Sequence, residues 1–338
     1  MTTPVVICDD SGMARKQMAR ALPEDWDIEL TFAAEGEQCL EEVRNGRGEV
    51  VFLDLNMPGL DGYGVLQTIY EEELPALVVV VSGDVQPEAR ERVKKLGAID
   101  FIRKPTDPEA LLELLTRYGL YVPAEKSTDS PSPTHSRSEE AGTVTWMEAL
   151  GEMSNVAMGQ AGDLLARLLD VFVELPIPRV NTLEPTELRM ALSIADSEDS
   201  WSGVCQGFIG SGVAGEALLL FSDSRVERMS QLLGHDPDED TNRHIEVLMD
   251  MSSILVGAFL SGLGRQLDIN FGVSHPSVLG THVLIGDLLE HNSQSWDRML
   301  AIELNYALEN QDIQCDLLLL FAEDAIPALQ QRIEYIME

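Results

Sequence analysis

The chain has 338 residues, enough for two or three domains, and its hydrophobic fraction of 44% is ample for buried cores. Lys and Arg number 23 against 58 Asp and Glu, and the formal net charge of -35 disfavours nucleic acids and anionic membranes as partners. No apolar run approaches the roughly 18 residues of a membrane span, and the N-terminus has no signal-peptide pattern.

The cysteines indicate a reducing, cytoplasmic environment. They are far apart in sequence and have neither the spacing of a metal site nor that of a disulfide framework, so we expect free thiols. The four are Cys8, Cys39, Cys205 and Cys315.

Residues 1–121 alternate short apolar runs with helical patterns. The segments "PVVIC", "VVFL" and "ALVVVV" are rich in β-branched residues, as expected of parallel strands buried on both faces. "DIELTFAA" and "AIDFI" are weaker strand candidates. This order predicts an α/β domain with a five-stranded, doubly wound parallel sheet.

Polar side chains follow the predicted strands, where ligands of parallel sheets bind. They are Asp9, Asp10, Asp54, Ser82 and Lys104. Three clustered carboxylates repel one another unless a cation is present, and Mg²⁺ suits a site of carboxylates, water and phosphate oxygens. One carboxylate could then attack a phosphoryl donor and become an acyl phosphate, while the hydroxyl and the ammonium group hold the phosphoryl oxygens.

This pattern resembles the CheY-like receiver domain of bacterial response regulators, a flavodoxin-like fold. The resemblance implies that Asp54 is the phosphoacceptor of a two-component phosphorelay. It also implies Mg²⁺ as cofactor, with Asp9 and Asp10 as ligands, one of them through water, and the backbone carbonyl of Asn56 as a further ligand. Ser82 and Lys104 would contact the phosphoryl group, and Phe101 occupies the position of the family's aromatic switch residue.

After the receiver-like segment, residues 122–143 are rich in Ser, Thr and Pro and nearly devoid of apolar residues. This composition predicts a flexible linker. Residues 144–338 form the remaining domain, and they open on a predicted helix, Trp146 to Asp170.

This helix has a mostly apolar stripe and, roughly opposite, a second stripe of acids, an amide and a glycine. The second stripe consists of Glu148, Glu152, Asn155 and Gly159. A solvated face is the usual interpretation of such a stripe. Glycines weaken a helix, however, by up to about 1 kcal/mol each relative to Ala. They leave room for another protein to approach, so we expect this stripe to face a partner's active site.

The domain repeats internally. A second helix, Ile245 to Asp268, carries Glu246, Asp250, Ser253 and Gly257 at positions equivalent to those of the first stripe, each 98 residues further on (250 − 152). "ALLLFSDS" near Phe221 is echoed by "LLLLFAED" near Phe321. Such matches at nearly one period predict a duplicated α+β domain with pseudo-twofold symmetry, its halves covering about 144–242 and 243–338.

The repeated helix with Glu148, Glu152 and Asn155 resembles the CheC and CheX family of phosphatases, which act on CheY-type receivers. The resemblance implies that Glu152 and Asn155 are catalytic and that Glu148 supports them. A carboxamide can accept a hydrogen bond from an attacking water and donate one to a phosphoryl oxygen. Glu152 could pair with the lysine of a receiver. In the second helix Asp250 and Ser253 are shorter than Glu and Asn, so we expect this second site to be degenerate.

The sequence therefore predicts a chemotaxis signalling protein in which a receiver, phosphorylated by a histidine kinase, regulates a hydrolase for the aspartyl phosphate of a CheY-like receiver. In a variant of this hypothesis, the phosphatase domain hydrolyses the aspartyl phosphate of the receiver in its own chain. The alternative from another class is a non-catalytic adaptor that binds a chemotaxis partner such as the deamidase CheD. We do not expect a flagellar-switch component, since relatives of that kind carry an extra C-terminal domain.

Overall fold

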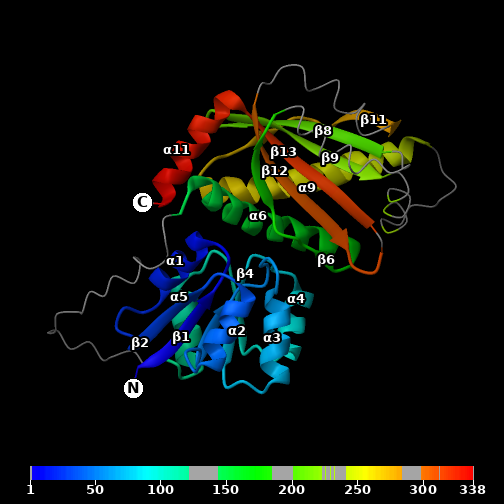
Figure 1. Cartoon of the computed structure of the whole chain (residues 1–338). Coiled ribbons are helices and arrows are strands. Elements are labelled where there is room, and N and C mark those ends of the chain that lie inside the picture. The colour runs from blue at the N-terminus through cyan, green and yellow to red at the C-terminus, as the bar shows by residue number, and fades with distance from the viewer. Residues whose placement is uncertain are drawn as a thin grey trace. The chain divides into compact units, whose positions relative to one another are not determined.

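The computed structural model describes residues 2–121, 144–184, 201–222, 241–283, 298–311 and 313–337, together with residues 225, 229 and 232 (Figure 1). The chain forms two compact units, Met1–Glu152 and Met153–Glu338. The boundary falls inside helix α6 (Trp146–Leu169). The predicted linker, 122–143, lies outside the described residues, and the domain limits 1–121 and 144–338 stay predictions.

The first unit contains a five-stranded parallel sheet with strand order β2-β1-β3-β4-β5 (Figure 1). This confirms the predicted doubly wound α/β domain, including its two weaker strand candidates. The strands are β1 (Thr3–Cys8), β2 (Ile28–Ala33), β3 (Val50–Leu53), β4 (Leu77–Ser82) and β5 (Asp100–Arg103).

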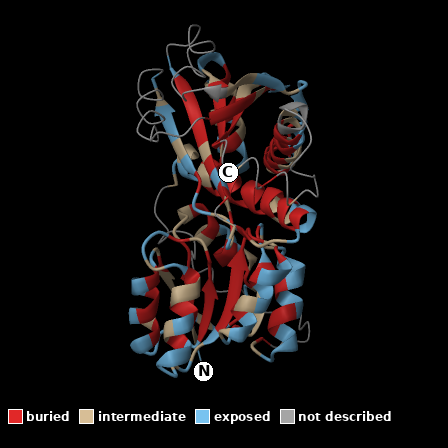
Figure 2. Cartoon of the chain, turned by 90° about the vertical axis from the view of Figure 1, so that its right-hand side faces the viewer, coloured by how far each residue is buried: buried red, intermediate tan, exposed pale blue. Residues whose placement is uncertain are grey.

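Helices cover both faces of this sheet. Helices α1 (Gly12–Ala21) and α5 (Pro108–Arg117) pack on the face that carries Ile7 and Phe52. The other face is covered by α2 (Gly36–Arg44), α3 (Gly62–Glu71) and α4 (Pro87–Lys95). Because alternate side chains of a strand point to opposite faces, a strand between two helical layers must be apolar at every position. The buried strands and exposed outer helix surfaces in Figure 2 follow this rule.

The second unit contains a mostly antiparallel sheet of eight strands. Its strands are β6 (Val173–Glu174), β7 (Arg179–Leu183), β8 (Trp201–Gly210), β9 (Val213–Ser222), β10 (Gly272–Val273), β11 (Ser277–Val283), β12 (Met299–Leu308) and β13 (Ile313–Ala322). Besides α6, its described helices are α9 (Thr241–Leu267), the short 3-10 helix η2 (Glu323–Ala325) and α11 (Ile326–Met337).

The strand pairings of this sheet are symmetric. β9 and β13 pair with each other, and each also pairs with the preceding strand, β8 or β12. β8 in turn pairs with β10 and β11, while β12 pairs with β6 and β7. Exchanging β6–β9 for β10–β13 therefore leaves every pairing unchanged. The chain order helix, two short strands, two long strands also occurs twice.

Helix α9 packs closely against α6. A Cβ at Gly262 would lie 3.0 Å from Ala157 Cα, and Gln266 Nε2 donates to the backbone oxygen of Met153 at 2.8 Å. The segment Ile245–Leu267 has a mean hydropathy of 1.6 and is long enough to cross a membrane, but 61% of its most apolar window is buried. Burial of this kind is typical of the core helix of a globular domain, which passes the same test.

Candidate functional site

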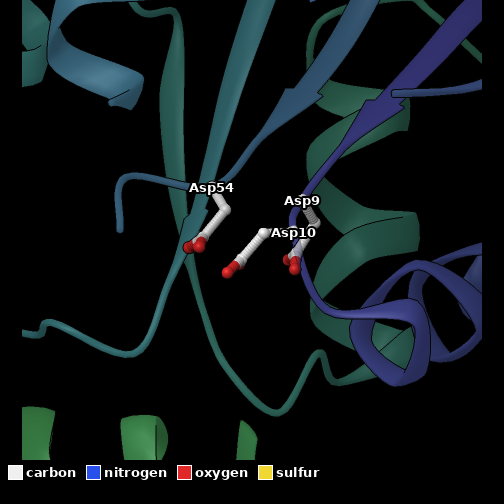
Figure 3. A group of neighbouring side chains, drawn as sticks. All are labelled: Asp9, Asp10 and Asp54. Atoms are coloured by element: carbon white, nitrogen blue, oxygen red, sulfur yellow. The ribbon is translucent and has the colours of Figure 1, made fainter. Parts of the chain in front are cut away.

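The parallel register of β1 and β3 brings the acidic residues together. Cys8 pairs with Leu53 at the carboxyl ends of these strands, and the backbone N–H of Asp54 donates to the carbonyl of Cys8 at 2.9 Å. Asp9 and Asp10 therefore follow one strand at the same level at which Asp54 follows its neighbour. Figure 3 shows the three carboxylates gathered at this edge of the sheet.

The carboxylate oxygens of Asp9, Asp10 and Asp54 lie within 4.8 Å of one another. Asp9 and Asp54 are 4% and 1% exposed. Asp9 Oδ1 accepts a hydrogen bond from the backbone of Ser11 at 2.9 Å, whereas neither oxygen of Asp54 accepts one from any residue that the structure describes. Buried carboxylate oxygens without donors need a cation or a proton.

Lys104 joins this cluster from the end of β5. Its Nζ atom lies 2.7 Å from Asp9 Oδ2 and 3.3 Å from Asp54 Oδ1. The pairing of β4 with β5 positions it, because the backbone N–H of Lys104 donates to the carbonyl of Ser82 at 2.9 Å. Ser82 is fully buried, and its Oγ accepts a hydrogen bond from the backbone of Asp84. The candidate residues at the ends of four strands, β1, β3, β4 and β5, therefore lie at the same edge of the sheet.

Burial and mutual repulsion shift the pKa values in this cluster. Burial raises the pKa of Asp54 well above its ordinary value; Lys104 opposes that rise and Asp9 adds to it. Burial, and after it the charge of Asp9, raise the pKa of Asp10 to about 6. For Lys104, burial acts to lower the pKa, but Asp54 and Asp9 together raise it well above the usual range. One ammonium group does not neutralise this many carboxylates.

The site fits a hard divalent cation. Its candidate ligands are all carboxylate oxygens, which Mg²⁺ prefers. Neither Asp54 oxygen accepts a hydrogen bond from the described residues. Asn56 is half-buried in the loop after β3. The Mg²⁺ ligands Asp9, Asp10, Asp54 and Asn56 remain a prediction.

Phe101 lies on β5 and is half-buried against the cluster formed by α2, α3 and α4. The guanidinium carbon of Arg90 lies 5.1 Å from the centre of its ring, a cation–π contact between α4 and β5. The predicted switch role of Phe101 is consistent with this position but is not tested by it.

Gly62 lies against the backbone of Asp54 and was not identified from the sequence. A Cβ at this position would lie 2.2 Å from the backbone oxygen of Asp54 and 2.7 Å from Leu55 Cα. Its own N–H donates to the carbonyl of Leu55 at 3.0 Å. Only glycine allows α3 to begin so close to the loop that carries Asp54.

Glu152 belongs to the first compact unit and reaches the same lysine. Its Oε1 atom lies 3.0 Å from Lys104 Nζ, and its side chain is 7% exposed. Burial raises the pKa of Glu152, while the neighbouring ammonium group of Lys104 opposes this rise. Lys104 therefore contacts three carboxylates, those of Asp9, Asp54 and Glu152.

Glu148 caps the start of α6, and its supporting role in catalysis stays a prediction. Its Oε2 accepts hydrogen bonds from the backbone N–H and the hydroxyl of Thr145, at 2.7 Å and 3.0 Å, and its own N–H donates to Thr145 Oγ1 at 3.2 Å. These reciprocal bonds are a capping box at the start of α6. The signal, Thr followed by Glu three positions later, is present in the sequence. Glu148 is exposed and fixes the helix end.

The stripes of α6 and α9 differ in exposure. Glu152 and Asn155 are 8% and 6% exposed, whereas the equivalent Asp250 and Ser253 of α9 are both exposed. The Ser253 hydroxyl donates to the backbone carbonyl of Met249 at 2.8 Å, one turn back in its own helix. That bond engages the hydroxyl proton within the helix, and the degeneracy of this second site stays a prediction.

All four cysteines are free, as predicted. Three of them, Cys8, Cys39 and Cys315, are buried, and Cys205 is half-buried. A hydrogen bond with Cys39, and after it burial, raise the pKa of Cys8 far above its ordinary value, so this thiol beside the acidic cluster stays protonated.

Comparison with known proteins identifies the first domain. Residues 5–116 match the family of the response regulator receiver domain. Together with the five-stranded parallel sheet and the strand-end carboxylates, this match establishes that the N-terminal part of the chain is a CheY-like receiver domain.

The similar curated proteins share part of this chain. A protein-glutamate methylesterase/protein-glutamine glutaminase of Geobacter sulfurreducens is 34% identical over 103 residues, 30% of this chain and 28% of its own length. Its counterpart in Symbiobacterium thermophilum is 31% identical over 169 residues, 49% of this chain and 46% of its own length. This chain therefore spans less than half of either relative.

Solved structures also match part of the chain. Vibrio cholerae chemotaxis protein CheY4 is 27% identical, with a TM-score of 0.32, and the match covers 35% of this chain and 98% of that protein. Thermotoga maritima FliY is 15% identical, with a TM-score of 0.44, over 56% of this chain and 96% of that protein.

Proposed function

We propose that the chain is a chemotaxis response regulator whose second domain is a CheC-like phosphatase for the aspartyl phosphate of a CheY-like receiver. Asp54 is the phosphoacceptor of its own receiver and takes a phosphoryl group from a donor such as a histidine kinase. The symmetric strand pairing, with one long helix before each set of strands, supports a duplicated CheC-like architecture.

The observation that carries the phosphatase proposal is the 3.0 Å ion pair between Glu152 and Lys104. Lys104 is the phosphoryl-binding lysine of a receiver, and Glu152 is the acid of the proposed catalytic motif. A carboxylate that pairs with this lysine sets the register between a catalytic helix and an acyl phosphate. Asn155, three residues further along α6, then lies on the same side of the helix.

The chemistry needs few groups. An acyl phosphate hydrolyses when a water molecule is held in line with the departing carboxylate. The Asn155 amide oxygen accepts a hydrogen bond from that water, and its amide N–H donates to a phosphoryl oxygen. The new bond joins the water oxygen to phosphorus, the bond to the aspartate oxygen breaks, and the aspartate leaves as a carboxylate. A bound Mg²⁺ would neutralise charge on the phosphoryl oxygens.

An assay of phosphoryl loss from a labelled CheY-type receiver tests the proposal. The added protein is the full chain with Asp54→Ala, so that its own receiver cannot take part. We expect accelerated release of inorganic phosphate, reduced about 100-fold by Asn155→Ala because the water loses its orienting group. Equal release with and without Asn155 would contradict the assigned mechanism.

The similar methylesterase/glutaminase proteins favour a second candidate, hydrolysis of a glutamyl methyl ester or a glutamine side-chain amide. The supporting observation is the 169-residue similarity to the Symbiobacterium protein, which is longer than the receiver match of residues 5–116. Methanol or ammonia release from receptor glutamyl esters or glutamines separates this activity from phosphate release. A chain with neither activity that binds a partner such as CheD would be the adaptor.

A further inference from the structure

Arg15, near the start of α1, is bonded to the backbone that carries two of the candidate Mg²⁺ ligands. Its guanidinium Nη1 donates to the backbone carbonyl of Asp9 at 2.5 Å. Side chains of a helix lean toward its N-terminus, so Arg15 reaches back to the loop that joins β1 to α1. The acceptor is a neutral carbonyl and not a carboxylate, so this contact fixes the path of the chain.

The carbonyl of Asp9 belongs to the peptide unit that joins Asp9 to Asp10. A peptide unit is planar, so a bond that fixes this carbonyl also fixes the N–H and the Cα of Asp10. The Asp10 carboxylate lies within 4.8 Å of those of Asp9 and Asp54, in the group drawn in Figure 3. The orientation of one peptide plane therefore determines whether the Asp10 side chain points into the acidic cluster.

Other hydrogen bonds hold different atoms of this loop. The N–H of Asp9 donates to the carbonyl of Ala33 at 3.1 Å, and Asp9 Oδ1 accepts from the N–H of Ser11 at 2.9 Å. The Ser11 hydroxyl in turn caps the start of α1. These bonds fix the N–H and the side chain of Asp9, whereas the bond from Arg15 fixes the plane of the next peptide unit.

We propose that Arg15 is a positioning residue for the Mg²⁺ site, and that it strengthens cation binding although it is itself a cation. This inference rests on the proposed phosphoacceptor role of Asp54 and its predicted Mg²⁺, and it adds a residue to that site. The charge of the guanidinium repels Mg²⁺, but Arg15 is only half-buried and salt screens its charge. Residues that orient metal ligands change metal affinity by about 10- to 100-fold, so positioning outweighs repulsion.

Calorimetric titration of the full chain with Mg²⁺ at pH 7.5 tests the sign of the effect. Arg15→Met retains most of the apolar stem of the side chain but removes the donor. We expect its Mg²⁺ dissociation constant to be about tenfold higher than that of the parent. Arg15→Lys keeps the charge and a donor group, so it should recover part of the lost affinity. Equal or tighter Mg²⁺ binding by Arg15→Met would overturn the proposal.

Arg20 provides a matched control, because it lies in the last turn of the same helix and is exposed. Arg20→Met removes the same charge from α1 and should leave the Mg²⁺ affinity unchanged. If it weakens binding as much as Arg15→Met does, the effect does not depend on the bond to Asp9 and the proposal is wrong. Melting curves without Mg²⁺ establish that each variant is folded, and Arg15→Ala replaces Arg15→Met if the latter is not.

Labelling of Asp54 by acetyl phosphate gives a second readout. A positioning role predicts that the Mg²⁺ concentration for half-maximal labelling rate rises about tenfold in Arg15→Met. The rate at saturating Mg²⁺ should stay near that of the parent, because the bound cation then orders its own ligands. A slower rate at saturating Mg²⁺ with an unchanged midpoint would assign Arg15 to another step and overturn the proposal.

The failures of this inference and of the proposed function are distinguishable. If the parent chain binds no Mg²⁺, the predicted ligand set is wrong and the role of Arg15 is wrong with it. If the parent chain binds Mg²⁺ and is labelled on Asp54, and Arg15→Met does both equally well, the receiver chemistry stands and only the role of Arg15 is wrong. Phosphate release from a separate receiver, which depends on Asn155, tests the phosphatase domain independently.

Discussion

At the residue scale, Asp10 shows how burial in the acidic cluster makes the stability of the fold depend on pH. Its pKa in the folded chain is about 6, against 3.8 for an ordinary Asp, chiefly because of burial. The folded state thus binds this proton more tightly than the unfolded state does. In metal-free protein, the contribution of Asp10 to the free energy of unfolding rises as the pH falls from 7 toward 5.

The same shift predicts that protons compete with Mg²⁺. Below pH 6 the Asp10 carboxyl is mostly protonated and cannot ligate a cation, so the apparent Mg²⁺ affinity should fall about tenfold per pH unit. Calorimetric titrations at pH 7.5, 6.5 and 5.5 measure this. An affinity that is equal at all three values would mean that Asp10 is no ligand, directly or through water.

Gly62 yields a second prediction at this scale. Gly62→Ala should lower the free energy of unfolding by about 1–3 kcal/mol, because a methyl group cannot fit 2.2 Å from the Asp54 carbonyl oxygen without moving the loop. Labelling of Asp54 by acetyl phosphate should slow as well. Gly257→Ala is the control, since a Cβ there would meet no atom of the described residues within 4 Å outside its own helical turn, and the helix gains up to about 1 kcal/mol. Equal melting curves for Gly62→Ala and the parent would contradict the argument.

At the element scale, α6 carries its capping residue, Glu148, and the acid of the proposed phosphatase motif, Glu152, four positions apart. Glu148→Gln should leave phosphoryl loss unchanged, because Gln also completes a capping box with Thr145. Glu152→Gln should slow it, because the ion pair with Lys104 is lost. The decay rates of the two variants, measured side by side, test the distinction. A slow Glu148→Gln variant would return Glu148 to the catalytic set.

Elements also explain what the sequence could and could not predict. The β-branched runs predict buried strands, and the rule that parallel strands end at one edge then brings Asp9, Asp54 and Lys104 together. The capping role of Glu148 was readable from Thr145 but was overlooked beside the Glu152–Asn155 motif. The bond from Ser253 to the Met249 carbonyl was not predictable, since a helical serine can equally well point its hydroxyl outward.

At the scale of the whole molecule, tertiary contacts account for what was missed. The need for glycine at position 62 arises from the path of the loop after β3, which no local pattern specifies. The three carboxylates around Lys104 come from separate parts of the chain: Asp9 follows β1, Asp54 follows β3 and Glu152 lies on α6. The spacing of the motif identified Glu152 as a candidate, but its burial against Lys104 depends on the fold.

Steady-state phosphate release with acetyl phosphate as donor tests the central claim, that an aspartyl phosphate is both made and hydrolysed by this chain. We predict continuous release by the parent chain, none above background for Asp54→Ala, and accumulation of phosphorylated protein with about 100-fold slower release for Asn155→Ala. Release at the parent rate by Asn155→Ala would contradict the account.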